Sequence, residues 1–279
     1  MIGWLGLFVW LAFWAEQEPP VQLHPGIRLT SHTRSEPYPL HWWCVTIELG
    51  HPQLEWVVTP GEQVPAGFHT RAETTLAFAQ RFGVLAAINA SPFEPLAKQA
   101  GEPVRIDGLS LSAGRLVSPP KAHFGALLLG PGPRARILSP PVTPEDVADA
   151  THGVGGFSPL VRLGQNLFTG EEAQAARHPR TAVGLSQDGR TMQWLVVDGR
   201  QPRSLGVTQR ELAELGIAAG CWTMLNLDGG GSSTLVVFDP VRREHRVVNA
   251  PVGKTLPGTL RFNGNHLGVR SRTAPAAAP

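Results

Sequence analysis

Three consecutive glycines follow a hydrophobic strand pattern in Leu225-Asn226-Leu227-Asp228-Gly229-Gly230-Gly231-Ser232-Ser233-Thr234. Glycine lets the backbone turn with its N–H groups exposed and lets a ligand approach closely. The turn therefore combines one carboxylate, several backbone donors and two hydroxyls, which suits an oxyanion or a cluster of sugar hydroxyls. No Gly-Lys-Ser/Thr closes it, so it is not a P-loop, and its spacing is not that of a dinucleotide fingerprint. A tight turn without a ligand is the alternative.

Polar residues stand at the ends of other predicted strands in the same way. Asn89 follows one apolar stretch, Arg180-Thr181 precedes a second, and Asp198-Gly199-Arg200 follows a third, with Ser204 close behind. Each has an ordinary explanation when taken singly, such as a surface arginine or a type I′ turn. Together they predict one rim, which presents Asn89, Arg180, Asp198 and Asp228. The residues expected to bind substrate or phosphate are Asn89, Arg180, Thr181, Arg200, Ser204, Gly229, Gly230, Gly231, Ser232 and Ser233.

The composition favours short strands joined by turns. Among 279 residues there are 31 glycines and 26 prolines, and 42% of the residues are hydrophobic, which is enough to form a core. Capping boxes at Thr70–Glu73 and Thr208–Glu211 predict helices over 74–81 and 209–215, and Thr143-Pro144 begins another. We expect a single α+β domain with a mixed or antiparallel sheet core and a few short helices.

Two hairpins are expected within this domain, joining strands 42–49 and 54–59 and strands 124–129 and 136–138. Strands 182–185 and 192–197 are expected on either side of a Gln-Asp-Gly turn, and strands 222–227 and 234–238 on either side of the glycine-rich turn.

The ends of the chain differ in composition from its middle. Residues 1–15, MIGWLGLFVWLAFWA, are an apolar run shorter than the roughly 20 residues of a spanning helix. They predict a secretory signal peptide, with an N-terminal anchor or a buried first strand as alternatives. Residues 16–40 predict a linker, 41–270 the folded domain, and 271–279 a disordered tail. We therefore expect a secreted or cell-envelope protein that meets the membrane only through its N-terminal segment.

Charge and residue counts narrow the classes of function. The net charge is +2 with no basic tract, which argues against nucleic acid as a partner. The ten histidines lack the spacing of zinc ligands, and no serine stands in a Gly-x-Ser-x-Gly motif. Cys44 and Cys221 either form a disulfide in an oxidising compartment or remain separate buried thiols.

Five blocks in this order resemble the phosphodiester glycosidase family, over roughly residues 40–270. The glycine-rich block is the most specific of them. After Asn89 the family usually has glycine, whereas this chain has Ala90-Ser91-Pro92-Phe93, which alters the pocket wall there. The blocks are Ala87-Ile88-Asn89, Ser158-Pro159-Leu160-Val161-Arg162-Leu163-Gly164, Pro179-Arg180-Thr181-Ala182-Val183-Gly184, Val197-Asp198-Gly199-Arg200 with Ser204 and Gly206, and Asn226-Leu227-Asp228-Gly229-Gly230-Gly231-Ser232-Ser233.

The resemblance implies a hydrolase that releases a sugar from a sugar-1-phosphodiester by cleaving the glycosidic C1–O bond, with a phosphate-linked glycan as substrate. A phosphate leaving group needs arginine and backbone donors more than a strong general acid. Either Asp198 or Asp228 then activates water or stabilises an oxocarbenium-like centre.

Two other functions remain open. One is a metal-dependent phosphodiesterase that cleaves P–O, with Asp198, Asp228 and Asn89 as oxygen ligands for Ca²⁺ or Mg²⁺, although the sequence requires no cofactor and shows no dedicated metal motif. The other is a non-catalytic module that binds envelope polysaccharide.

Overall fold

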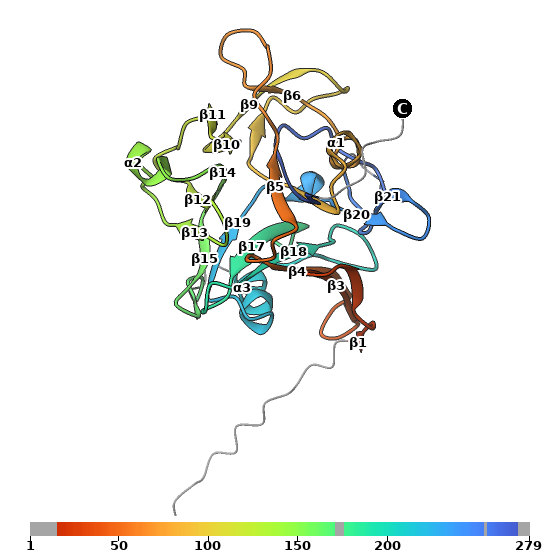
Figure 1. The fold of residues 1–279 in the computed structure, drawn as a ribbon. Helices are drawn as coiled ribbons and strands as arrows, with labels where there is room; N and C mark the ends of the chain where they lie inside the picture. The colour runs from red at the N-terminus through yellow and green to blue at the C-terminus, as the bar shows by residue number, and fades with distance from the viewer. Residues whose placement is uncertain (1–15, 171–175, 254–255, 273–279) are drawn as a thin grey trace, which may run out of the picture.

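The largest sheet of the computed structural model has nine strands, all paired antiparallel (Figure 1). The structure describes residues 16–170, 176–253 and 256–272. The strands of this sheet, in spatial order and with β2 (Val21–His24) paired to β3, are β1 (Glu16–Gln17), β3 (Ile27–Arg34), β4 (Leu40–Glu48), β18 (Thr191–Val197), β17 (Arg180–Leu185), β19 (Thr223–Asn226), β15 (Pro159–Arg162) and β16 (Gln165–Asn166).

Three smaller antiparallel sheets complete the described fold. The second sheet runs β21 (Glu244–Val247), β20 (Leu235–Asp239), β7 (Ala86–Asn89), β22 (His266–Ser271) and β5 (Leu54–Val58). The third runs β11 (Arg115–Ser118), β10 (Ser110–Ser112), β14 (His152–Gly156), β12 (Gly125–Leu129) and β13 (Ala135–Leu138). The fourth runs β6 (Thr70–Arg71), β9 (Pro103–Ile106) and β8 (Phe93–Glu94).

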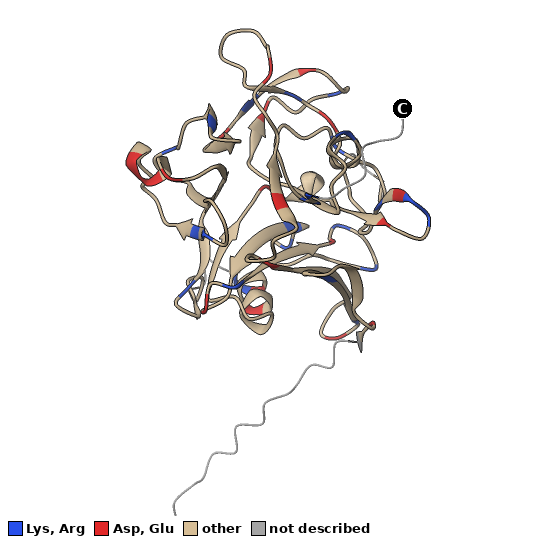
Figure 2. Ribbon diagram, in the orientation of Figure 1, with Lys and Arg blue, Asp and Glu red and all other residues tan. Residues whose placement is uncertain are grey.

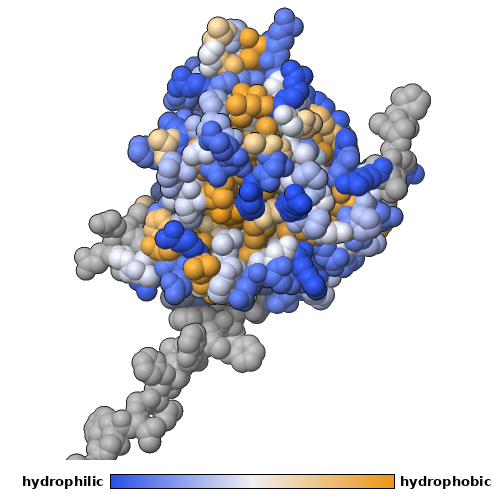
Figure 3. All heavy atoms as spheres, turned by 60° about the vertical axis from the view of Figure 1, so that its left-hand side comes forward, coloured by the Kyte–Doolittle hydropathy of each residue, from blue (hydrophilic) through white to orange (hydrophobic). Residues whose placement is uncertain are grey.

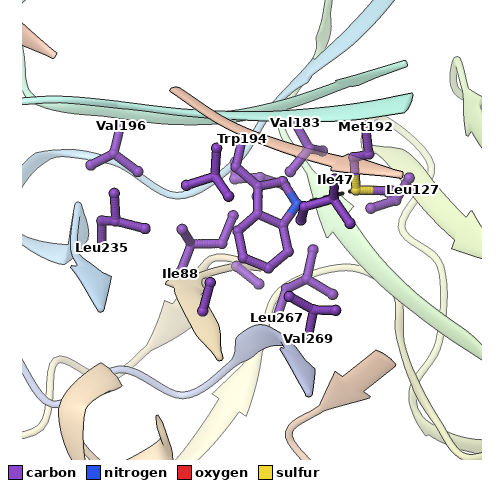
Figure 4. Close-up of a cluster of buried hydrophobic side chains, with 14 of the residues drawn as sticks. Ile47, Ile88, Leu127, Val183, Met192, Trp194, Val196, Leu235, Leu267 and Val269 are labelled. Carbon is purple, nitrogen blue, oxygen red and sulfur yellow. Dashed lines mark hydrogen bonds between the residues drawn. The ribbon is translucent and has the colours of Figure 1, made fainter. Parts of the chain in front are cut away.

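The main core lies between the large sheet and the second and third sheets. Strand β18 shows how the sequence fills it, since successive side chains of a strand point to opposite faces. Met192, Trp194 and Val196 point into the main core, with Trp194 at its centre (Figure 4). Leu195 and Val197 point the other way, into a second apolar cluster beneath a helix. Both faces of the strand are covered, so its sequence is almost continuously apolar.

Three short α-helices lie in the described part of the chain. They are α1 (Thr75–Phe82), α2 (Pro144–Val147) and α3 (Gln209–Ala218). The capping box Thr208–Glu211 of α3 is present as expected. In α1 the N-cap is Thr74, whereas Thr70 lies in β6, so the expected capping box there is wrong. The fold is therefore largely β, and the α+β expectation holds only in coarse form.

Two local predictions fail because strand pairing is decided over long distances. Residues 16–40, expected as a linker, contain β1, β2 and β3 and the start of β4. Ile27 and Leu29 of β3 are buried, so this segment extends the large sheet. The hairpin expected over 42–59 does not form, because β4 pairs with β3 and β18 while β5 pairs with β22. The other expected hairpin, β12–β13, is confirmed, and the strands on either side of the Gln-Asp-Gly turn pair as β17–β18. The strands on either side of the glycine-rich turn, β19 and β20, lie in different sheets.

The remaining expectations concern the cysteines and the chain ends. Cys44 and Cys221 are free and buried, and burial raises the pKa of the Cys44 thiol to about 12. The expected signal peptide or anchor over 1–15 lies outside the described residues, as does the expected tail beyond Arg272. Within the described residues no helix has the length and apolar character to cross a membrane.

The surface is mixed in character. Figure 2 shows that acidic and basic residues are interspersed along the ribbon. On the face in Figure 3, apolar side chains reach the surface in groups bordered by hydrophilic ones.

The fully buried His266 predicts an acid-sensitive fold. Its ring stacks on Phe78 and its Nδ1 lies 3.1 Å from Thr59 Oγ1, while burial lowers its pKa from 6.5 to about 3. In the unfolded chain the imidazole takes up a proton below about pH 6.5, whereas in the folded chain it stays neutral. Stability is therefore retained above pH 6.5 and lost as the pH falls toward 3.

A comparison with His266→Gln isolates this effect. Between pH 7 and pH 5, urea denaturation should show the natural protein losing about 2 kcal/mol more unfolding free energy than the variant. Equal losses in the two proteins would show that His266 does not bind protons differently in the folded and unfolded states.

Candidate active site

A buried asparagine ties two sheets to the glycine-rich turn. Asn89 ends β7 and is only 1% exposed. Its Oδ1 accepts hydrogen bonds from Thr181 Oγ1 (2.8 Å) and from Thr234 N (3.2 Å). Its Nδ2 donates to the backbone oxygen of Asp228 (2.6 Å). Asn89, Thr181 and the turn, predicted to share a rim, are thus brought together through the interior rather than across a surface.

The glycine-rich turn packs directly on the segment that contains Arg180. The N–H of Gly230 donates to Pro179 O at 2.8 Å, and a Cβ on Gly229 would lie 3.0 Å from the same oxygen. Gly230 has φ +61, a left-handed conformation that glycine adopts at little cost. The turn needs glycines for both close approach and backbone conformation, and it places Asp228 beside Arg180's strand.

Asp228 is partly exposed at the start of this turn. One carboxylate oxygen accepts from Gly229 N at 2.9 Å. Burial raises the pKa of Asp228, while a hydrogen bond from Ser232, the charge of Arg261 and the Gly229 N–H act in the opposite direction. The carboxyl group is therefore a candidate for proton transfer as well as for electrostatic stabilisation.

Two predicted arginines lie beside the turn. The Nε of half-buried Arg180 donates to Val207 O at 3.3 Å. Arg200 is exposed, and its Nη2 lies 3.2 Å from His178 Nδ1. Its guanidinium is also 3.3 Å from the position that a Cβ on Gly230 would occupy. The guanidinium of Arg200 is thus held close to the backbone of the turn, and the Cδ of Arg180 lies 3.9 Å from the position that a Cβ on Gly229 would occupy.

A third arginine, which the sequence did not indicate, also contacts the turn. Nη1 of half-buried Arg261 donates to Ser232 Oγ at 3.2 Å. A Cβ on Gly231 would lie 2.4 Å from its Nη2. Arg261 lies in an irregular segment before β22, with neither a strand pattern nor a motif around it, so no sequence signal could have found it.

The charge of Arg200 acts on the other two guanidinium groups. Burial lowers the pKa of both Arg180 and Arg261, and the positive charge of Arg200 lowers both further. Asp228 acts in the opposite direction on Arg261. Because like charges at short range repel, this arrangement favours an anion that accepts hydrogen bonds from several of them.

Asp198, the other predicted catalytic carboxylate, has a different environment. It is 3% exposed, and its oxygens accept hydrogen bonds from Asn249 Nδ2 (2.9 Å) and Ala250 N (3.1 and 3.0 Å). Burial raises its pKa, opposed by those two partners and by Arg203. Its carboxylate therefore holds the segment that follows β21. Asn249 is a second residue that the sequence analysis did not identify.

The predicted serines also differ from one another. Ser204 is buried, donates to Asp198 O (2.7 Å) and accepts from His41 N (3.1 Å), so it braces two backbone segments. Ser232 Oγ accepts the hydrogen bond from Arg261 Nη1 that is described above. Among the described residues, the buried oxygens Ser233 Oγ, Thr234 Oγ1 and Asn226 Oδ1 have no hydrogen-bond partner. Polar atoms with unused hydrogen-bonding capacity thus flank the turn on both sides.

Two of the three predicted oxygen ligands for Ca²⁺ or Mg²⁺, Asn89 and Asp198, are already engaged. Asn89 Oδ1 accepts two hydrogen bonds, and Asp198 accepts from two amide groups. Within the described ranges, no group of three or more His, Cys, Asp or Glu residues is arranged to hold a metal ion.

The comparison with protein families identifies the chain as a member of one of them. The model of the phosphodiester glycosidase family matches residues 82–270, which include Asn89, Asp228 and the three arginines. The chain therefore belongs to this family, as its motifs indicated. Over 61 residues it is 44% identical to an uncharacterised prophage-derived protein, YomE, of Bacillus subtilis. That match covers 22% of this chain and spans only 9% of the length of YomE.

Solved structures share the fold. The catalytic domain of zebrafish N-acetylglucosamine-1-phosphodiester alpha-N-acetylglucosaminidase, auto-inhibited by its pro-peptide, superposes with a TM-score of 0.66 at 19% identity, covering 92% of this chain and 88% of that one. A hypothetical protein from Synechocystis gives 0.65 at 14% identity, covering 88% and 62%. A putative exported protein from Burkholderia pseudomallei gives 0.59 at 16%, covering 83% and 74%.

Gly231→Ala tests the contact between the turn and Arg261. The added Cβ would displace the guanidinium from Ser232, because it would lie 2.4 Å from Nη2 and 2.9 Å from Val252 O. The displaced guanidinium could then no longer donate to an anion bound at the turn. Losing that charge-assisted hydrogen bond, worth about 1.5–3 kcal/mol, should weaken anion binding by about tenfold or more. The measurement is the stabilisation of each protein by inorganic phosphate in thermal unfolding.

Gly170→Ala is the matched control, since a Cβ there meets nothing within 4 Å. It should respond to phosphate as the natural protein does. An unchanged phosphate response in Gly231→Ala would contradict the role given to Arg261.

Proposed function

We propose that this protein is a hydrolase that cleaves the glycosidic C1–O bond of a sugar-1-phosphodiester within an extracytoplasmic glycan or polymer. The observation that carries the proposal is the meeting of Arg180, Arg200 and Arg261 around a glycine turn with one nearby carboxylate, Asp228. Family membership supports the reaction class. The apolar run at residues 1–15 supports a site of action outside the cytoplasm.

The charges suit a phosphodiester. Its phosphate carries one negative charge and two unesterified oxygens, which planar guanidinium groups can bind in pairs. Bound there, the phosphate offsets the mutual repulsion of the arginines. As the C1–O bond breaks, a second negative charge develops on the departing phosphate, and the arginines stabilise it in the transition state.

Asp228 is the carboxylate that we assign to the reacting sugar. It is partly exposed and adjoins the turn, and burial raises its pKa, which favours a role in proton transfer. Its carboxylate activates water or stabilises positive charge at C1. We assign Asp198 a positioning role, because Asn249 and Ala250 occupy its oxygens in a buried setting.

The position of an isotope label in the products tests the bond that breaks. In water enriched in heavy oxygen, a purified sample should convert a sugar-1-phosphodiester into labelled free sugar and unlabelled phosphomonoester, with or without a chelator. Label in the phosphate, with loss of activity in chelator, would instead indicate a metal-dependent phosphodiesterase. Tight binding without turnover would indicate a polysaccharide-binding module.

Paired aspartate substitutions separate the two assigned roles. Asp228→Asn should lower kcat by about 10²–10⁴-fold with an unchanged melting temperature. Asp198→Asn should lower stability by about 1–3 kcal/mol, because an amide nitrogen would face the donors of Asn249 and Ala250, yet it should retain most of its kcat below the melting temperature. The reverse pattern would make Asp198 the reacting group.

A further inference from the structure

A second candidate site lies at the other end of the sheets. Two adjoining cavities of ≈ 570 Å³ and ≈ 720 Å³ share Glu48, Gly50, His51, Pro52 and Pro133. They form one continuous groove, called here the distal groove. Each of the two cavities has a volume within the range of about 300–1,000 Å³ that is typical of small-molecule sites.

Strand register places the distal groove away from the glycine turn. In the second sheet, Asn89 pairs with His266 near the candidate active site, whereas Leu54, in the groove wall, pairs with Ser271 at the opposite end of β22. In the large sheet, β18 begins at Thr191 in the groove and ends at Val197, just before Asp198. The two sites therefore lie at opposite ends of the same strands.

The groove wall mixes one aromatic ring with hydrogen-bonding groups. Trp56 is half-buried, with its ring centroid 6.2 Å from that of Trp194 beneath it. Glu48, Glu55, Thr151 and His152 also line this cavity. Glu55 directly precedes Trp56 in β5, so its side chain points to the opposite face of the strand. An indole offers an apolar face and one N–H donor, while carboxylates accept hydrogen bonds from hydroxyl groups.

Acidic and basic residues are mixed in the groove, unlike in the arginine cluster. Its lining includes Glu48, Glu55 and Asp188 together with Arg190 and Arg272, and Glu55 is also paired with Arg270. Burial lowers the pKa of His152, which favours the neutral imidazole. An anionic ligand would therefore meet carboxylates as well as arginines, and an apolar ligand would bury these charges without hydrogen-bonding them.

We propose that the distal groove binds an uncharged oligosaccharide, with a sugar ring against Trp56 and its hydroxyls donating to Glu48. Sugar rings combine apolar C–H faces with many hydroxyls, which matches this wall. The binding does not depend on the proposed hydrolysis. If the hydrolysis also holds, a polymeric substrate can be held at both ends of the protein.

Gly50→Phe is the substitution that tests the groove most cleanly. A Cβ at Gly50 makes only an ordinary 3.7 Å contact with Pro133 Cβ, so the backbone there accepts a side chain, and we expect a phenyl ring on it to obstruct the region that the two cavities share. Trp56→Ala is less suitable alone, because Trp56 packs on the main core. Val241→Phe is the control, since Val241 is 91% exposed and lines neither cavity.

The experiment is calorimetric titration of the full chain with maltotetraose and with the N-acetylglucosamine tetramer. At least one should bind the natural protein and Val241→Phe equally, and Gly50→Phe at least tenfold more weakly. Inorganic phosphate should not compete, and Asp228→Asn should bind as the natural protein does. Failure of both sugars to bind, competition by phosphate, or unchanged binding by Gly50→Phe would overturn the proposal. Because no turnover is measured, the outcome is independent of the hydrolysis.

Discussion

The side chain of Asn89 makes three hydrogen bonds at a point where two sheets approach each other. It reaches from β7 to Thr181 of β17, to the backbone of Thr234 and to the backbone of Asp228. Each partner comes from a different strand or strand end, so the bridge fixes the spacing between the sheets and the position of the glycine turn. Losing any one partner of such a buried polar group costs folding free energy. The bridge therefore holds the candidate site in a fixed position.

The site built on this bridge brings positively charged side chains close together, so that they repel one another. One turn is approached by the side chains of Arg180, Arg200 and Arg261. The negative charge of Asp228 opposes the positive charge of Arg261. The glycines make this possible, since side chains at 229–231 would collide with Pro179 or with the guanidinium groups. A bound phosphate relieves the repulsion, and the relief grows as charge moves onto the leaving group. Ligand affinity and catalysis therefore draw on the same arrangement.

The strand ends and the α3 cap could be predicted because their signals are local. Thr208 and Glu211 are three residues apart, and the β17–β18 hairpin closes through a short turn. The partner of β4 could not be predicted, because β18 lies about 150 residues away and any apolar strand would satisfy the same pattern. The membership of 16–40 in the large sheet was missed for the same reason.

In the candidate site, too, local features could be predicted from the sequence and long-range contacts could not. Asp198 and Asp228 follow their strands in the same local pattern, a carboxylate and then glycine. Their surroundings differ because Asn249 and Ala250, from a remote segment, meet only Asp198. Arg261 also comes from such a segment. Sequence could therefore predict which residue types gather at the rim, while the role of each depends on contacts that form only in the folded chain.

The most direct test of the account is a crystal structure of the Asp228→Asn variant with an intact sugar-1-phosphodiester. The phosphate should lie among Arg180, Arg200 and Arg261 against the backbone of Gly229–Gly231, with the anomeric carbon facing residue 228. A phosphate bound away from these arginines, or a sugar directed toward Asp198, would contradict it.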